Sequence, residues 1–485
     1  MKRYKILLPL FITLLSNTLA ADELEDSLSG FDDTAPPAAK DSTAVANTSL
    51  PDDPPASYTL NGYTALFSAY NYASKNAAVS LGDTPMDFSG LSRVKAKGGL
   101  SLEMKHGENW RSKIEALAWY DASWAINGKD NYTDDVLDTY ETFIYLKDAY
   151  IQGSLTPHLD LKFGRQIVIW GKSDSIRITD IINPLDNRNP GIGDIEDLRL
   201  NETMTRLDYY VGNWALSSII IHEPRLDIEA EFGSDYRPSD AFGSPIPYAK
   251  FPDRLEPHLN LENTQYAISL DGRFTGWDLS YYAAQVYSNR FDITAINNSL
   301  LRTFNKINML GLASNVVYGS WLFKAEAAYI NDINYRSTNN KNRLDALIGF
   351  DYMGKKDVLI SLEIANRHIF NYEDKMHSMT LQEAIALNTF PDFVRQDSMQ
   401  IALRTSFDFD HDNTTLTYLL SLMGGNGSGN NIDGGFQRLW VDYKYSDAIS
   451  LSAGIIDYIG GDGTIPFYNA IENNDRAFVE IKTSF

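Results

Sequence analysis

From Tyr58 onward, the chain alternates between apolar and polar residues over long stretches. In residues 93–104, for example, every second position is Val, Ala, Gly, Leu or Met, and most of the positions between them are charged or polar. The same period of two recurs over 113–120, 279–283, 358–364 and 401–407. Because successive side chains of a strand point to opposite faces, this pattern predicts strands with one apolar and one polar face. The expected fold class is all-β.

The connections between these strands alternate between short and long. Short ones, most of them rich in Gly, Asn, Asp or Ser, are expected near 105–109, 154–158, 211–213, 272–276, 318–320, 354–357, 409–413 and 446–448. Long ones are expected near 74–89, 126–139, 171–203, 222–263, 288–306, 331–343, 369–396, 424–435 and 461–474. A transmembrane barrel has short periplasmic turns and long external loops, whereas a soluble sandwich has no reason for this asymmetry.

This alternation predicts a transmembrane antiparallel β-barrel of 18 strands over residues 58–485, with both termini on the periplasmic side. Sixteen strands are the alternative if the short segments 203–211 and 214–222 do not span the membrane. The last strand, Arg476–Phe485, alternates and ends on an aromatic residue. It resembles the C-terminal strand that the barrel-assembly machinery reads in bacterial outer-membrane barrels.

The N-terminus predicts export. Residues 1–20 have a basic start, an apolar run of about ten residues and a small residue, Ala20, as in a secretory signal peptide. Residues 21–57 then form an acidic, proline-rich segment that we expect to be flexible, because it has too little apolar surface to offset its ordering entropy. It is interpreted as a solvated tether or as a docking element for a periplasmic partner or the barrel interior, through Leu24, Leu28 and Phe31.

The composition excludes several classes of function. The chain has 42 Lys and Arg against 64 Asp and Glu, a formal net charge of −22, which argues against nucleic acid as a partner. It has no cysteine, which excludes disulfides, thiolate zinc sites and cysteine catalysis. The 7 histidines are scattered and form no known catalytic motif. We therefore expect neither an enzyme nor a metal or other cofactor.

Basic residues on the polar strand faces are candidates for the lumen, because charges facing lipid are costly. The first and last strands of a closed barrel are neighbours, so these bases would form one basic wall that favours anionic solutes or head groups. In the alternative, they pair with acids across strands and merely fill the lumen. The candidates are Arg93, Lys95, Lys97, Arg111, Lys113, Arg404, Arg438, Arg476 and Lys482.

The long connection 171–203 is the strongest candidate for a constriction or plug. Its isoleucines and Leu185 are too apolar for a loop in water, and the barrel interior is the nearest place to bury them. Asn183-Pro184 would end any short helix there. The connection 222–263 contains six prolines, so it should be stiff and is interpreted as a cap over the mouth.

The chain also carries a family signature. Residues 163–171 read Phe-Gly-Arg-Gln-Ile-Val-Ile-Trp-Gly, and Asp174, Arg177, Asp180 and an Asn183-Pro-Leu-Asp186 turn follow. This motif resembles the signature of a proteobacterial outer-membrane family of unknown function. The resemblance implies a porin-like barrel whose genes accompany an inner-membrane transporter of the resistance-nodulation-division class and a periplasmic lipid-binding-like protein. Arg165, Trp170, Asp180, Asn183, Pro184 and Asp186 are the resulting candidates for a structural or gating centre, with helix caps and turn formers as the other interpretation of Asp180 and Asp186.

Three functions therefore remain open for a bacterial outer-membrane barrel. The first is a passage that works with periplasmic and inner-membrane partners to move a lipid or another hydrophobic or anionic cargo. The alternative is a stand-alone, porin-like channel for small anionic solutes, selected by charge and width. The third is a surface adhesin or structural barrel, which only the long loops favour.

Overall fold

The computed structural model describes residues 57–485 except 74–78, 82–83, 87, 194, 232, 238–252, 298, 337, 379–391, 426–431 and 462–465. The expected signal peptide and almost all of the acidic segment, with Leu24, Leu28 and Phe31, lie outside the described residues.

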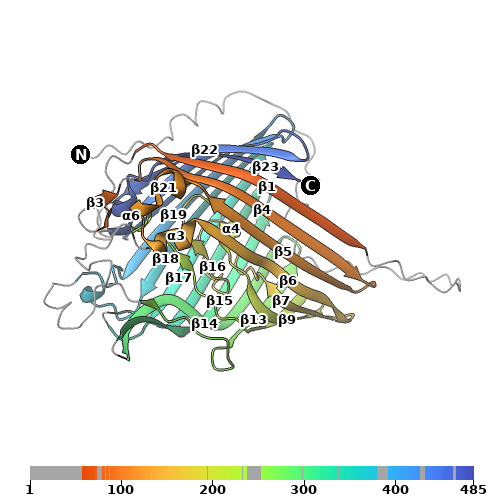
Figure 1. The fold of residues 1–485 in the computed structure, drawn as a ribbon. Helices are drawn as coiled ribbons and strands as arrows, with labels where there is room; N and C mark the ends of the chain where they lie inside the picture. The colour runs from red at the N-terminus through yellow and green to blue at the C-terminus, as the bar shows by residue number, and fades with distance from the viewer. Residues whose placement is uncertain are drawn as a thin grey trace. The chain divides into compact units, whose positions relative to one another are not determined.

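The described chain forms a closed antiparallel barrel of 18 long strands (Figure 1). These are β1 (Tyr58–Asn71), β4 (Gly90–His106), β5 (Trp110–Asp121), β6 (Thr142–Thr156), β7 (Leu159–Gln166), β9 (Glu202–Val211), β10 (Trp214–Ile221), β13 (Gln265–Phe274), β14 (Trp277–Ile296), β15 (Ser299–Tyr318), β16 (Trp321–Ile333), β17 (Lys341–Lys355), β18 (Val358–Ile369), β19 (Asp397–Phe409), β20 (Thr414–Gly425), β21 (Ile432–Lys444), β22 (Ile449–Gly460) and β23 (Arg476–Ser484). Each pairs with the next, and β1 pairs with β23 to close the ring.

This confirms the predicted barrel and strand number and excludes sixteen strands, because the short segments 203–211 and 214–222 supply β9 and β10. The small strands are β2 (Val79–Leu81), β3 (Thr84–Met86), β8 (Asp186–Asn187), β11 (Ile228–Glu229) and β12 (Asp253–Arg254). The short helices are α2 (Ser123–Ile126), η2 (Lys129–Asn131), α3 (Asp134–Tyr140), α4 (Ile195–Leu198), η4 (Asp374–Met376) and α6 (Pro466–Ile471). In the described residues no helix has the length and apolarity to span a membrane.

One predicted connection is wrong. Residues 288–306 are not a long loop, because β14 and β15 continue through them as a hairpin with strands of 20 residues each. Phe291 lies opposite Phe304, and Ile293 lies opposite Arg302, in this extension. Phe291, Ile293 and Ala295 alternate with Arg290, Asp292 and Thr294, so the period of two continues through this part of β14. The prediction therefore ended these strands too early.

The outer surface of the barrel is apolar. Exposed aliphatic side chains such as Leu66, Ile114, Leu310 and Ile348 point outward from their strands. Exposed aromatic residues lie at the ends of strands next to the short turns: Tyr209, Trp277, Tyr318, Trp321, Phe409, Tyr443 and Tyr445. An apolar band with an aromatic girdle is the surface that a transmembrane barrel presents to lipid.

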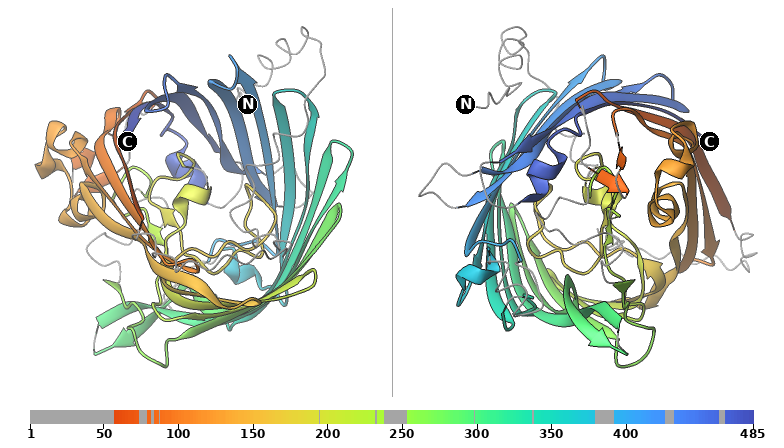
Figure 2. Two further views of the ribbon diagram at one scale, coloured as in Figure 1. Left: turned by 90° about the vertical axis from the view of Figure 1, so that its right-hand side faces the viewer. Right: turned by 60° about the vertical axis from the view of Figure 1, so that its left-hand side comes forward.

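The interior is not an empty channel. The connection between β7 and β9 folds into the barrel, as predicted, and so does part of the connection between β10 and β13 (Figure 2). The two connections pair with each other through the short parallel ladder of β8 and β11. The largest cluster of buried apolar side chains lies where the first of them packs against the inner wall.

Candidate functional site: the luminal plug

The connection 167–201 between β7 and β9, here called the inner loop, contacts widely separated parts of the wall. Residues 172–179 hydrogen-bond to β16 and β18, as described below. On β22, Tyr458 donates from Oη to the carbonyl of Pro190 at 2.6 Å. On β21, Arg438 donates from Nη1 to the carbonyl of Gly191 at 3.2 Å. The inner loop therefore crosses the lumen rather than lining one side of it.

Two buried glutamates of the wall hold the inner loop by its backbone. Glu326 on β16 and Glu363 on β18 are 4% and 1% exposed. Hydrogen bonds to a charged acceptor are stronger than neutral ones, and the loop N–H groups have no ladder partner to satisfy them. The donors to Glu326 are the N–H groups of Lys172 (2.5 Å), Ser173 (2.7 Å) and Thr179 (3.2 Å), and those to Glu363 are the N–H groups of Asp174 (2.7 Å), Ser175 (3.0 Å) and Ile176 (3.0 Å).

Ion pairs compensate the charges around this contact. Lys324 on β16 is buried and forms ion pairs with Asp351 at 2.7 Å and with Asp174 of the inner loop. Lys172 of the loop reaches Asp278 on β14 at 3.1 Å. A buried charge needs compensation: Glu363 lies 3.9 Å from Lys324, and Glu326 accepts hydrogen bonds from the loop N–H groups and from the Thr179 hydroxyl.

The apolar side of the inner loop packs on an apolar inner wall. Trp170 is 4% exposed and stacks on Tyr282 of β14, with ring centroids 4.7 Å apart. Ile176 and Ile178 are each 1% exposed. The wall residues buried in the same cluster include Met204, Ile219, Ile221, Val286 and Met309, on β9, β10, β14 and β15. Such apolar packing inside the lumen is unusual, because the interior of an outer-membrane barrel is generally polar.

The signature residues separate into two groups. Asp180 accepts from Arg177 Nε at 3.1 Å and from Arg199 Nε at 2.9 Å. Asn183 accepts from the Val168 N–H at 2.8 Å and donates to the Leu200 carbonyl at 3.0 Å, and the Pro184 carbonyl accepts from the Leu200 N–H at 2.8 Å. Asp186 pairs with Arg188 at 2.5 Å. These contacts tie the two ends of the inner loop together. Asp180 takes part through arginine side chains, whereas Asp186 also accepts from the Arg188 N–H at 3.2 Å, as in a turn.

Arg165 and Trp170 lie apart from that centre. Arg165 is on β7 in the wall and pairs with Glu223 at 2.9 Å. Trp170 is at the start of the inner loop and contacts β14. The signature therefore marks the fold of the inner loop and its attachment to the wall, not one cluster of side chains.

The second infolded connection, residues 222–264, is anchored at the seam where the barrel closes. Asp235 has a fully buried side chain and accepts from Arg93 of β4 at 2.9 Å and from Arg476 of β23 at 2.7 Å. Both guanidinium groups also lie over aromatic rings, Arg93 over Tyr140 at 5.1 Å and Arg476 over Tyr236 at 4.5 Å. Asp235, Arg93 and Arg476 are here called the seam clamp. The clamp attaches this infolded connection to β4 and β23, the strands on either side of β1 where the barrel closes.

The other basic candidates are largely engaged inside the barrel. Lys97 pairs with Glu480 at 2.5 Å and Lys113 with Asp148 of the neighbouring β6 at 3.0 Å, as the lumen-filling alternative expects. Arg111 lies opposite Gln152 and bonds to its side chain. Lys95 lies over Trp119, and Arg404 and Arg438 lie over Trp440.

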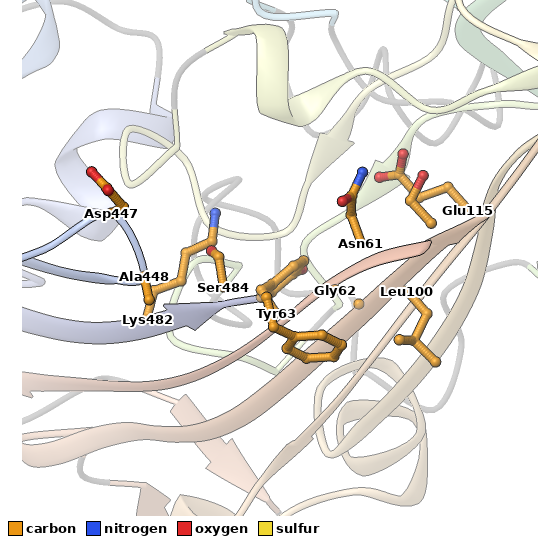
Figure 3. Close-up of a pocket in the computed structure, with 12 residues that line it drawn as sticks. Asn61, Gly62, Tyr63, Leu100, Glu115, Asp447, Ala448, Lys482 and Ser484 are labelled. Atoms are coloured by element: carbon orange, nitrogen blue, oxygen red, sulfur yellow. The ribbon is translucent and has the colours of Figure 1, made fainter. Parts of the chain in front are cut away.

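Lys482 lies over Tyr63 and lines a pocket of about 450 Å³ at the short-turn end of the seam, with Glu115 and Asp447 (Figure 3). The bases are thus distributed among ion pairs, aromatic rings and this pocket, and do not form one continuous wall. In the described part of the chain, no group of three or more His, Asp or Glu side chains is arranged to hold a metal ion.

Sequence reasoning missed the residues that hold the plug. Glu326, Glu363 and Lys324 follow the alternation of their strands as ordinary lumen-facing positions, and Asp235 lies in a connection without a motif. Their partners are distant in sequence, 150 residues in the case of Lys324 and Asp174. No local signal marks Glu326, because its neighbours Ala325 and Ala327 point to the opposite, outer face of the strand.

We expect one pH-dependent contact in the plug. Asp227 accepts from the Leu185 N–H at 2.7 Å, and burial raises the pKa of its carboxyl from 3.8 to about 6. Because this pKa is higher in the folded than in the unfolded state, the folded state gains stability as pH falls from about 6 to about 4. The Asp227→Asn variant should lose about 1–2 kcal/mol of that gain, measured as the difference in urea unfolding between pH 4 and pH 7. An unchanged pH difference would contradict the assignment.

The family model described as "Protein of unknown function (DUF1302)" matches residues 39–485. No curated protein sequence matches. Among solved structures, Pseudomonas aeruginosa OccK9 (OpdG) is 9% identical with a TM-score of 0.51, over 89% of this chain and 98% of that one. A BenF-like porin from Pseudomonas fluorescens Pf-5 is 10% identical with a TM-score of 0.49, over 89% and 98%. The likeness to OccK9 shows a shared fold, that of outer-membrane porins.

Proposed function

The chain belongs to the family described as "Protein of unknown function (DUF1302)", and on that premise we propose that it is an outer-membrane passage for a hydrophobic or amphipathic anionic cargo, closed by the inner loop. The closed barrel with its apolar outer band supports a place in the outer membrane. The short turns and both ends of the barrel chain lie at one end, which we assign to the periplasm.

One observation carries the proposal: the inner wall under the inner loop is apolar. Met204, Ile221 and Met309 are at most 1% exposed, and the loop side chains pack against the same cluster. If the loop moved away and water replaced it, each fully uncovered side chain would cost about 1.5–3 kcal/mol. An apolar cargo would remove that cost, so opening favours a hydrophobic molecule over a small polar solute.

The bases on the lumen side indicate that the polar part of the cargo is anionic. Lys95 and Lys482 lie over aromatic rings at β4 and β23, which flank β1, across the barrel from the apolar wall of β9, β10, β14 and β15. Bases on the side of the lumen that faces the apolar wall suit an amphiphile whose anionic head and apolar chain contact different sides of the lumen. We further propose that residues 21–57 dock a periplasmic partner of an envelope transport system, as the family resemblance implies.

The test combines conductance with binding. We expect the purified protein in planar bilayers to conduct little, and to bind dansylaminoundecanoic acid, an anionic amphiphile, with a fluorescence increase that chloride does not displace. Deletion of residues 21–57 should leave binding unchanged, because that segment serves docking. Steady, anion-selective conductance of the intact protein without dansyl binding would instead establish the stand-alone channel for small anions, which the inward bases also favour.

A further inference from the structure

The barrel wall is lowest at four consecutive strands. β7 and β10 have 8 residues each and β9 and β13 have 10, whereas β4 has 17 and β14 has 20. A strand of 8 residues is about 26 Å long, and at a tilt of about 40° it rises only about 20 Å. The apolar band of an outer-membrane barrel is about 25 Å tall. β7 and β10 therefore stop short of the full depth of the hydrocarbon, and the 10-residue β9 and β13, which rise about 25 Å, only just reach it.

The neighbouring strands leave open edges above the short ones. β6 pairs with β7 only from Ala149 toward the short turn, so among the described strands residues 142–148 pair with β5 alone. β14 pairs with β13 only from Phe274↔Trp277 as far as Gln285, so among the described strands Tyr287 and residues 291–296 pair with β15 alone. The wall thus has a notch at its long-loop end, four strands wide and bounded by the edges of β6 and β14.

Residues 223–229, here called the strap, cross this notch. At the β6 edge, Arg225 donates from Nη1 to Tyr145 Oη at 3.4 Å and to the carbonyl of Asn201 at 3.0 Å. At the β14 edge, the Asp227 N–H donates to Asn289 Oδ1 at 2.8 Å. At both edges these are single hydrogen bonds that involve side chains, and between the edges the Glu223 N–H donates to the Thr203 carbonyl of β9 at 3.3 Å. Among the described residues the strap has no repeated backbone ladder like the one that closes the rest of the wall.

The strap is also coupled to the plug. The carboxylate of Asp227 accepts from the Leu185 N–H and, at 3.2 Å, from Asn187 Nδ2, both in the inner loop. The ladder of β8 and β11 continues this contact through Asp186 opposite Ile228. Movement of the inner loop away from the wall would therefore pull on the strap.

Lipid-facing side chains continue up to the notch. Ile144 on the β6 edge is 86% exposed and Leu146 is 42% exposed. Ile169, just beyond the end of β7, is 62% exposed. Apolar side chains this exposed are stable in contact with lipid. Acyl chains therefore reach the level at which the strap replaces the wall.

We propose that the notch is a lateral opening between the lumen and the lipid of the outer leaflet, closed by the strap. It rests on the proposed function, because a cargo that covers the apolar inner wall leaves most readily into another apolar medium. When the inner loop releases the apolar wall, the strap swings with it, and the cargo passes sideways between β6 and β14 instead of upward through water.

The test locks the strap to the wall. Because the natural chain has no cysteine, an Asp227→Cys, Asn289→Cys pair joined by a short reducible bifunctional reagent introduces one defined link. In proteoliposomes, transfer of bound dansylaminoundecanoic acid into the bilayer should fall at least about tenfold when the link forms and recover on reduction, since the link blocks a gating movement. The matched control is Ala283→Cys with Leu310→Cys, a cross-strand pair of β14 and β15 away from the notch. It should leave transfer unchanged.

A second readout separates this inference from the proposed function. A bimane label on Ile169→Cys should be quenched by brominated phospholipids, and a label on Leu226→Cys, in the strap and 6% exposed, should become quenched only when Glu326 and Glu363 are replaced with alanine. Transfer that persists in the locked protein, or a strap label never reached by brominated lipid, would overturn the lateral opening while the passage itself stands. Absence of dansyl binding would refute the proposed passage for an amphiphile. The quenching of the two bimane labels would then show, independently of any cargo, whether the notch opens to lipid.

Discussion

The Glu326→Ala, Glu363→Ala double variant is expected to release the inner loop and open the lumen. It removes the acceptors of six backbone N–H groups, those of Lys172, Ser173, Asp174, Ser175, Ile176 and Thr179. Hydrogen bonds to charged groups each contribute about 1.5–3 kcal/mol, so the loop loses most of its polar attachment to β16 and β18. Single-channel conductance in planar bilayers should rise severalfold above that of the unmodified protein.

Limited proteolysis provides an independent measurement of the same release. Trypsin should cut the double variant within the inner loop, after Lys172, Arg177 or Arg188, and leave the unmodified barrel uncut there. Glu480→Ala is the matched control, because it removes a lumen-facing glutamate whose partner is Lys97 of the wall. If the double variant and this control show the same conductance and the same tryptic fragments, the two glutamates do not hold the plug.

The Asp235→Ala variant should be the most destabilising single substitution in the seam. The Arg93 and Arg476 side chains are 2% and 0% exposed, and both donate to Asp235 across the closure of the barrel. Removing one member of a buried ionic group leaves uncompensated charge, at a cost of about 3–5 kcal/mol. Urea unfolding of the barrel in lipid vesicles should show this loss.

The companion variant tests whether charge is the cause. Replacing Arg93 and Arg476 with Met together with Asp235→Leu removes the three charges, and Asp121→Asn is added because the buried Asp121 also faces Arg93, at 3.8 Å. This quadruple variant should recover most of the stability, because well-packed apolar residues often replace a buried ionic group at little cost. A quadruple variant as unstable as Asp235→Ala would show that packing, not unpaired charge, governs the seam.

The pH dependence of the seam clamp has a defined sign. The two guanidinium groups lower the pKa of Asp235 to about 2. A pKa below that of the unfolded chain stabilises the fold above about pH 4, and this stabilisation is lost as pH falls toward 2. The clamp therefore acts in the opposite direction from Asp227, whose carboxyl favours the folded state at lower pH.

Sequence by itself determined the barrel. The period of two along the strands, together with the alternation of short and long connections, predicted the 18 strands and their antiparallel order, because both signals arise from local contact with lipid and water. It also indicated that the inner loop folds inward, because Ile178 and Ile182 are too apolar for an exposed connection. The extension of the β14–β15 hairpin was not predicted, although Phe291, Ile293 and Ala295 continue the alternation of β14, because the polar residues between them also suit a loop.

Only the tertiary structure decided what the lumen contains and where the wall is low. Glu326 and Glu363 look like ordinary inward residues until loop N–H groups 147 to 189 residues away in sequence are brought against them. Arg93 and Arg476 become a clamp only when ring closure places β4 and β23 beside the same β1 and Asp235 enters between them. Strand periodicity reports which face of one strand meets lipid. It does not report which distant segments fill the space that the closed strands enclose, because that depends on contacts formed after the ring has closed.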